Sequence, residues 1–177
     1  MNLLYHGSTI SGLTALRPDA KGAVFLTPNS TYALFYIRDR EINWVTCAVG
    51  TDDIVRYEEQ FQDQLRTIYG GIGGYIYACE ANTAQQTGER GVRIAREAVT
   101  IVGAEWILDA HDEIVRREAQ GLVRVTRSKE MTDDRRRGLH EHLTRYIREG
   151  GFLRVHSRKA AFLREHFPEA WRAAEEE

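Results

Sequence analysis

A histidine stands at the end of the first apolar run of the chain, in "LLYHGST" at residues 3–9. Leu3, Leu4 and Tyr5 suit a buried strand, and Gly7 then frees the backbone to turn. An imidazole at such a strand end can hydrogen-bond a ligand or move a proton, although a lone histidine is more often structural. His6 is therefore the first candidate functional residue.

Other reactive residue types lack the spacing that familiar chemistries require. Cys47 and Cys79 each lie in an apolar strand-like run, and two cysteines alone cannot build a zinc site, so buried free thiols are expected. His140 and His142 would point about 200° apart on a helix, which prevents them from sharing a metal ion. The "GGIGG" at 70–74 leads into a strand, the wrong context for a dinucleotide-binding loop. The sequence offers no P-loop, serine triad or catalytic cysteine.

The composition predicts one domain with a hydrophobic core, since 42% of the 177 residues are hydrophobic. The net charge of -2 does not predict an overall electrostatic attraction to nucleic acid or to an anionic membrane. No apolar stretch approaches the roughly 20 residues of a membrane span. Because the first strand is expected to start at residue 3, no cleavable signal peptide is expected. We therefore expect a cytoplasmic protein without structural disulfides.

Short strands and helices alternate over residues 1–108. Asn29 or Ser30 is expected to cap a helix that runs to about Arg38. The segment 57–69 has apolar residues at helical spacing, and the polar segment 83–91 is expected to be a loop too long for a simple hairpin turn. Residues rich in Val, Ile, Tyr, Trp and Thr predict strands at 3–6, 23–27, 42–49, 74–80, 98–103 and 105–108.

From about residue 110 the pattern becomes mostly helical. A helix is expected in "AHDEIVRREAQ", and a short strand in "GLVRVT". From Thr132 onward, two apolar stripes at helical spacing predict further helices. The mixed-charge "DDRRRG" is interpreted as a solvated helix start in preference to a nucleic-acid patch. We therefore divide the chain into residues 1–108 and a helical C-terminal extension, residues 109–177.

Three motifs occur in an order that points to one known family. His6-Gly7-Ser8 is followed by the strand "GAVFLT" at 22–27, which contains Phe25, then by Tyr36 and later by Glu97 beside an apolar strand. This order resembles the ADP-ribosyltransferase fold, in its diphtheria-toxin-like branch with a histidine–tyrosine–glutamate signature. That branch includes poly-ADP-ribose polymerases and rifampin ADP-ribosyltransferases. The resemblance covers about residues 1–108.

The resemblance implies an α+β fold, a split antiparallel sheet around an NAD cleft with flanking helices. It implies that His6 holds a hydroxyl of the adenosine ribose, and that Gly7, followed by Ser8, pairs with the nicotinamide amide. Phe25 and Tyr36 would then stack on nicotinamide. Glu97 would stabilise the oxocarbenium-like ribose that forms as nicotinamide leaves. No metal is implied.

Three departures from the family pattern bear on this expectation. Phe25 stands where many members have tyrosine, so the stacking face is kept and the hydroxyl is lost. Ala33 replaces a small hydroxyl residue that often binds the nicotinamide amide. The rifampin enzymes carry their acid just after the strand equivalent to 74–80, which makes Glu80 the reserve candidate for the acid. Tyr32 lies on the same helix face as Tyr36 and competes with it for the second aromatic position.

The sequence thus predicts an NAD-dependent ADP-ribosyltransferase acting on an unknown protein, nucleic acid or small molecule. Two other functions remain open: a catalytically weak module that binds NAD or ADP-ribose, and an RNA 2′-phosphotransferase-like enzyme. The latter family uses several arginines in its cleft, and the sequence alone places none there. The C-terminal extension is expected to pack on the domain or to recognise a partner protein.

Overall fold

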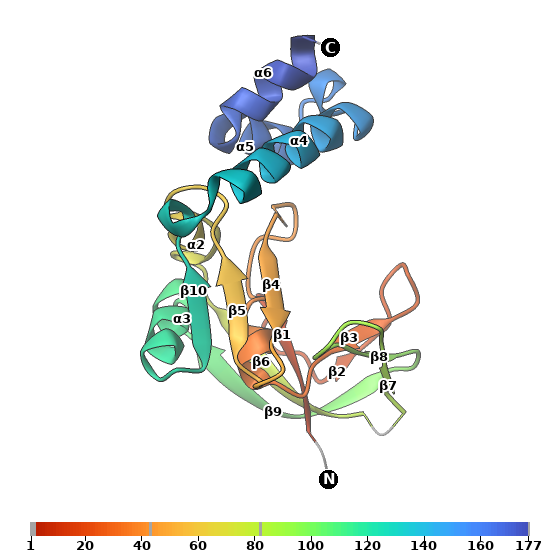
Figure 1. Cartoon of the computed structure of the whole chain (residues 1–177). Coiled ribbons are helices and arrows are strands. Elements are labelled where there is room, and N and C mark those ends of the chain that lie inside the picture. Colours follow the sequence, from red (N-terminus) through yellow and green to blue (C-terminus); the bar gives the residue numbers. More distant parts are fainter. Residues whose placement is uncertain (1–2, 43, 82, 177) are drawn as a thin grey trace.

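The longest strands of the chain pair into a curved antiparallel sheet. The computed structural model describes residues 3–42, 44–81 and 83–176. Its largest sheet has the strand order β1-β6-β9-β2, with every neighbouring pair antiparallel. These strands are β1 (Leu4–Ser8), β6 (Gly74–Glu80), β9 (Val99–Ile107) and β2 (Ala15–Leu16). The two strands predicted at 98–103 and 105–108 are therefore one continuous strand (Figure 1).

A second antiparallel sheet branches from the first. It has the order β3-β8-β7 and consists of β3 (Val24–Leu26), β8 (Arg93–Ala95) and β7 (Gln85–Gln86). The Tyr5 and Thr27 backbones join it to β1, with N–O distances of 2.7 and 2.9 Å. The segment 83–91, expected to be a loop throughout, thus contains the short strand β7. This junction brings the residues around Phe25 next to His6.

The third sheet corrects three sequence-based predictions. It has the order β10-β5-β4, made of β4 (Thr46–Val49), β5 (Val55–Glu58) and β10 (Val123–Thr126). The β10–β5 pair is parallel, so not all of the sheet structure is antiparallel. The helix predicted at 57–69 is wrong at its start, because Tyr57 lies in β5. The strand predicted at 42–49 is limited to 46–49, and its residue 43 lies outside the described residues.

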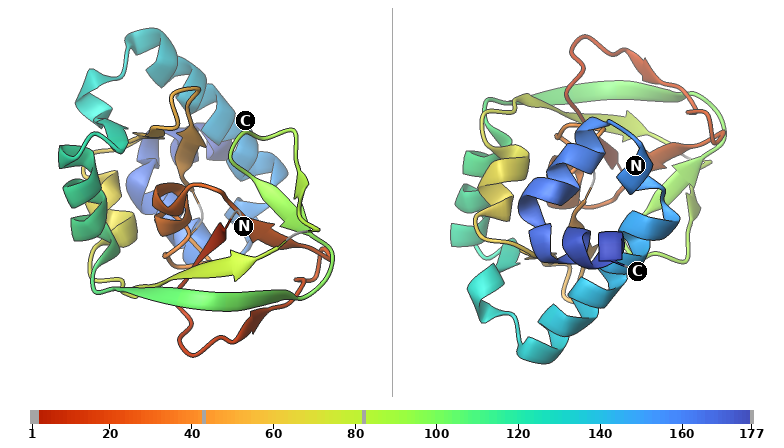
Figure 2. Two further views of the ribbon diagram at one scale, coloured as in Figure 1. Left: turned by 90° about the horizontal axis from the view of Figure 1, so that it is seen from below. Right: turned by 90° about the horizontal axis from the view of Figure 1, so that it is seen from above.

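Three short helices flank these sheets. They are α1 (Ser30–Leu34), α2 (Gln64–Tyr69) and α3 (Ala110–Ala119). Asn29 is the cap of α1, since its Oδ1 accepts a hydrogen bond of 3.0 Å from the Tyr32 amide. The helix ends at Leu34 instead of the predicted Arg38. Figure 2 shows α2 and α3 side by side at one edge of the molecule.

The C-terminal helices group at the opposite end of the molecule from β9 (Figure 1). They are α4 (Asp133–Glu149), α5 (Arg158–His166) and α6 (Pro168–Glu176), with 3-10 turns at Ser128–Glu130 and Phe152–Arg154. Thr132 caps α4, and the "DDRRRG" segment forms its exposed first turns. The predicted boundary at residue 108 falls between β9 and α3. After that boundary, α3 packs against α1, and β10 pairs with β5 before α4 begins.

One apolar cluster connects the β-rich part to these helices. Leu143 and Ile147 of α4 are buried in the same cluster as Tyr57 and Tyr69. Phe61 contacts Phe162 and Phe167 at ring-centroid distances of 5.8 and 5.5 Å. Large aromatic contacts of this kind dominate core energetics, so the helices are anchored on the sheets. The α+β class predicted from the sequence is confirmed.

No helix in the described part of the chain is both long and apolar enough to cross a bilayer.

Candidate functional site

Most of the motif residues predicted from the sequence, Glu97 excepted, line one cleft. The cleft has a volume of about 670 Å³ and lies against β1, β3 and the segment that follows α1. This size falls in the usual range for small-molecule sites. Five predicted residues line it: His6, Gly7, Ser8, Phe25 and Tyr36. We refer to it as the His6 cleft.

Phe25 holds the imidazole of His6 in one orientation. The Nδ1 atom lies 2.9 Å from the Phe25 carbonyl oxygen, and because a carbonyl only accepts, Nδ1 carries the proton. The pKa of His6 is lowered below its ordinary value mainly by burial, with the Phe25 hydrogen bond opposing the shift and the Arg40 charge adding to it. The ring is therefore neutral at pH 7. Its Nε2 is left as an acceptor for a ligand hydroxyl.

Two aromatic rings in the cleft are open to solvent. Phe25 is 40% exposed and Tyr36 is 37% exposed, whereas Tyr32 is only 3% exposed. Strand alternation explains Phe25, since its neighbours Val24 and Leu26 point into the core. Tyr32 is thus a core residue, packed edge-on against Tyr36 at 5.6 Å. Exposed aromatic faces at Phe25 and Tyr36 can stack on a flat ligand.

Gly7 and Ser8 also have structural roles in the fold. A Cβ atom at Gly7 would lie 1.9 Å from the Ala33 carbonyl oxygen of α1, so only glycine allows β1 and α1 to approach this closely. Ser8 is buried, and its Oγ accepts a hydrogen bond of 3.1 Å from the Ile10 amide. Ala33 itself is fully buried. These contacts fix the backbone that forms the inner wall of the cleft.

Neither acid proposed from the sequence is among the described residues that line the His6 cleft. Glu97 is exposed in the turn between β8 and β9. It follows Arg96, whose guanidinium donates to the Gly22 carbonyl at 3.2 Å and thereby ties this turn to the start of β3. Glu80 is exposed at the end of β6, paired with Thr100 of β9. Glu97 therefore lies at the end of the β3–β8 pair that carries Phe25.

A third acid, Glu89, was not predicted from the sequence; its charge acts on the cleft residue Tyr36, but it is not among the described residues that line the His6 cleft. Its Oε1 accepts a hydrogen bond of 3.1 Å from the Tyr32 hydroxyl. Burial is the main cause that raises the pKa of Tyr36, and the Glu89 charge adds to it. The unusual length of the 83–91 segment, with a glutamate between two glycines, is the signal that could have pointed to it.

Three arginines of the cleft were also missed. Arg17, Arg38 and Arg40 all line it. The Arg38 guanidinium carbon lies 5.5 Å from the centroid of the Tyr36 ring, and Arg38 also donates to the Phe35 carbonyl. Asp19 also lines the cleft, so three arginines accompany one carboxylate, and this excess of cations favours an anionic ligand.

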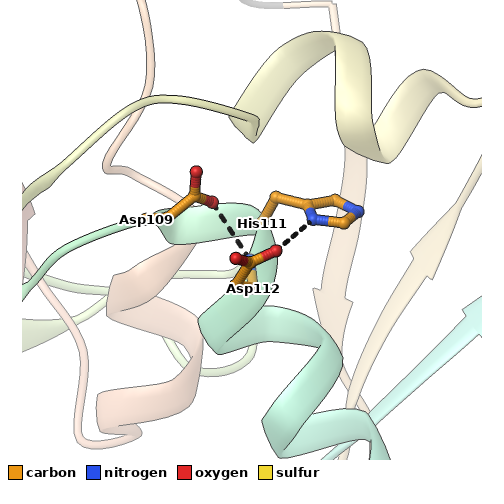
Figure 3. Close-up of side chains that lie close together, drawn as sticks. All are labelled: Asp109, His111 and Asp112. Carbon is orange, nitrogen blue, oxygen red and sulfur yellow. Dashed lines mark hydrogen bonds and ion pairs between the residues drawn. The ribbon is translucent and has the colours of Figure 1, made fainter.

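A small acidic cluster at the start of α3 is explained by helix capping (Figure 3). Ligand atoms of Asp109, His111 and Asp112 lie within 4.8 Å of one another. Asp109 Oδ1 accepts from the Asp112 amide at 3.1 Å, and its Oδ2 accepts from the Gly71 amide at 2.7 Å. His111 Nδ1 lies 2.9 Å from Asp112 Oδ1. Both Asp109 oxygens are thus used, one to cap α3 and the other to hold the turn between α2 and β6.

The two cysteines are free thiols. Burial raises the pKa of the Cys79 thiol to about 11 and also raises the pKa of Cys47. Neither sulfur is activated as a nucleophile at neutral pH.

No protein-family model, no curated protein and no solved structure matches this chain. The function is therefore argued from the cleft.

Proposed function

We propose that this chain is an NAD-dependent ADP-ribosyltransferase that moves ADP-ribose to an acceptor and releases nicotinamide. One observation carries the proposal: residues from β1, β3 and the segment after α1, singled out by motif order, line a single cleft. A neutral imidazole acceptor, two exposed aromatic faces and three cations match the chemistry of a dinucleotide. NAD is the co-substrate, and no metal is required.

The proposed binding mode assigns one role to each group. Nicotinamide stacks between Phe25 and Tyr36, whose exposed rings offer about 1–3 kcal/mol per stacked face. His6 Nε2 accepts a hydrogen bond from a hydroxyl of the adenosine ribose. Arg38 and Arg40 lie in the same cleft and are suited to the charge of the pyrophosphate.

Glu97 is the proposed stabiliser of the ribosyl cation. Its turn lies next to the β3–β8 pair, in which Val24, a cleft residue, pairs with Ala95. Glu97 forms no hydrogen bond or ion pair with any described residue, so its carboxylate is available to a ligand. Glu89, by contrast, is engaged by the Tyr32 hydroxyl. A carboxylate facing developing positive charge lowers the barrier without tightening the binding of NAD.

Nicotinamide release is the direct test of this proposal. The purified chain is incubated with NAD labelled in the adenine ring, with and without cell lysate, and free nicotinamide and labelled acceptors are measured. Release of nicotinamide that is lost in His6→Ala supports the proposal. Absence of both release and label transfer contradicts it. Tight NAD binding by calorimetry without turnover favours a module that only binds NAD or ADP-ribose, as the loss of the hydroxyl at Ala33 suggests.

A second candidate function rests on the three arginines. Enzymes of the RNA 2′-phosphotransferase type use arginines in their cleft, and Arg17, Arg38 and Arg40 line this one. Such an enzyme would need both NAD and an RNA with a 2′-phosphate. An assay with 2′-phosphorylated RNA and NAD distinguishes the two functions, because the transferase releases nicotinamide without that RNA.

A further inference from the structure

A second groove lies between the third sheet and helix α4, away from the His6 cleft. It has a volume of about 490 Å³ and is lined by residues of both parts, among them Trp44, Glu58, Arg135 and His142. We call it the Trp44 groove. In Figure 1, α4 crosses beyond the ends of β4 and β5. Thr46 and Glu58, directly paired on β4 and β5, line this groove, while Tyr57, next to Glu58 on β5, is buried in the core.

Aromatic rings make up one wall of the Trp44 groove. The Trp44 ring centroid lies 4.9 Å from that of Tyr146 and 5.9 Å from that of His142. His142 is exposed, and the other two rings are partly exposed. The indole is held in place because Trp44 Nε1 donates to Gln60, whose amide in turn donates to Thr46 Oγ1 at 2.6 Å. This wall is a fixed stacking surface with access to solvent.

Cations surround these rings. The Lys159 ammonium lies 5.2 Å from the Tyr146 ring centroid and 5.7 Å from that of Phe152. Arg135 holds Glu58, the one acid among the described residues that line the groove, with its Nε 3.0 Å from Glu58 Oε1 and an Nη 3.2 Å from Oε2. The carboxylate of Glu58 is therefore neutralised by a bidentate partner.

The groove continues along the outer face of the third sheet. A neighbouring hollow of about 370 Å³ shares Thr46 and Glu58 with the Trp44 groove and adds Arg56 and Arg124. These two arginines are directly paired positions on β5 and β10. Like charges in this arrangement destabilise a sheet. Arg56 is held by Asp52 at 2.8 Å, but Arg124 has no ion-pair partner among the described residues. An anionic ligand would compensate for this arrangement.

The charge of the C-terminal helices differs from that of the whole chain. Residues 133–166, from the start of α4 to the end of α5, contain nine Lys or Arg and five Asp or Glu, although the chain as a whole carries a net charge of -2. The chain therefore contains a local positive region, although its net charge is negative. This region includes α4, α5 and the rim of the Trp44 groove. Such a local excess of cations attracts polyanions at moderate salt concentrations.

We propose that the Trp44 groove and its continuation to Arg124 bind single-stranded nucleic acid. Unpaired bases stack on the aromatic wall formed by Trp44, His142 and Tyr146, and phosphates follow the cations from Lys159 to Arg124. Fixed aromatic faces beside a cationic track are the combination that recognises unpaired strands with little sequence preference. A duplex keeps its bases stacked on one another and cannot use the aromatic wall. This binding is independent of the chemistry in the His6 cleft.

Fluorescence anisotropy with labelled oligonucleotides of about 12 residues tests the proposal on the full chain without NAD. The probes are oligo(U), oligo(dT) and a blunt DNA duplex, titrated at several salt concentrations. We expect both single strands to bind at least about fivefold more tightly than the duplex. Comparison of oligo(U) with oligo(dT) shows whether RNA or DNA is preferred. Lys159→Gln and Arg124→Gln should each lower the magnitude of the salt slope by about 0.7.

Arg137→Gln is the matched control for charge. Arg137 lies about 140° around α4 from His142 and pairs with Asp134 at 3.1 Å. Because this position is away from the groove, Arg137→Gln should change the affinity for single strands less than about twofold. Trp44→Ala should weaken single-strand binding at least about fivefold, and Trp44→Phe should restore most of it. Circular dichroism establishes that each variant is folded, and Lys159→Gln tests the groove if Trp44→Ala unfolds.

Three results would overturn the proposal. They are the absence of single-strand binding at low salt, equal affinity for the duplex, and an equal loss in Arg137→Gln and Lys159→Gln.

Discussion

His6 Nδ1 lies 2.9 Å from the carbonyl oxygen of Phe25, so the backbone of one cleft residue orients the side chain of another. The same residue presents its exposed ring to the cleft. A histidine that donates to a backbone carbonyl keeps one tautomer and one ring orientation. The proposed ribose-binding and nicotinamide-stacking positions are therefore mechanically linked through β3.

The lowered pKa of His6 predicts a pH dependence of stability. In the unfolded chain the imidazole takes up a proton as the pH falls through its ordinary value of 6.5, whereas the folded protein resists protonation to a lower pH. The unfolded state then binds more protons, so the free energy of unfolding decreases as the pH falls through this window. Below the lowered pKa of the folded state this decrease stops.

Urea unfolding of the wild type and of His6→Gln at about pH 7.5 and 5.5 checks this dependence. The wild type should lose more stability than the variant between the two values. His166 also has a pKa lowered by burial, and it contributes equally to both proteins. An identical pH dependence in the two proteins would show that His6 is not buried in its neutral form.

Phe25 and Val24 are adjacent but should respond differently to truncation. Phe25→Ala removes an exposed ring, so we expect stability to change by less than about 1 kcal/mol while NAD binding weakens by about 1–3 kcal/mol. Val24 is 3% exposed, and Val24→Ala should instead destabilise the fold by roughly 1–3 kcal/mol. Thermal melts and calorimetric titration with NAD measure both quantities. A large loss of stability in Phe25→Ala, with NAD affinity unchanged, would mean that this ring serves the fold.

Gly7→Ala should be strongly destabilising. The added methyl would meet the Ala33 carbonyl oxygen at 1.9 Å, so β1 and α1 must separate, at a cost of about 1–3 kcal/mol or more. Gly138 of α4 is the control, since a Cβ there meets nothing within 4 Å. Gly138→Ala should stabilise the protein by roughly 0.5–1 kcal/mol. Chemical denaturation of the two variants gives the comparison, and equal stability would contradict the close approach.

Much of the fold could be predicted from sequence because several elements carry strong local signals. The apolar run before His6, the strand at 74–80 and the helix that begins at Ala110 all lie where their patterns predict. The segment around Tyr57 was predicted wrongly, because its apolar residues satisfy both helical and alternating spacing. Pairing with β10, far along the chain, decides in favour of strand, and no local pattern contains that information.

The same limit explains what was missed in the cleft. Motif order located His6, Phe25 and Tyr36, because each belongs to a short segment with a recognisable pattern. The arginines Arg38 and Arg40 were placed in or just after a predicted helix, but α1 ends at Leu34. The chain after it then runs along the cleft. Where a short helix ends depends on tertiary contacts more than on propensity.

The rate of nicotinamide release by Glu97→Gln tests the central claim most directly. The variant keeps the shape of the side chain and removes its charge, so we predict a rate about 10²–10³ lower than wild type, with NAD affinity almost unchanged. Glu80→Gln and Glu89→Gln, measured in parallel, should retain most of the rate. A Glu97→Gln enzyme with the wild-type rate, beside an inactive Glu80→Gln or Glu89→Gln, would contradict the assignment of the acid.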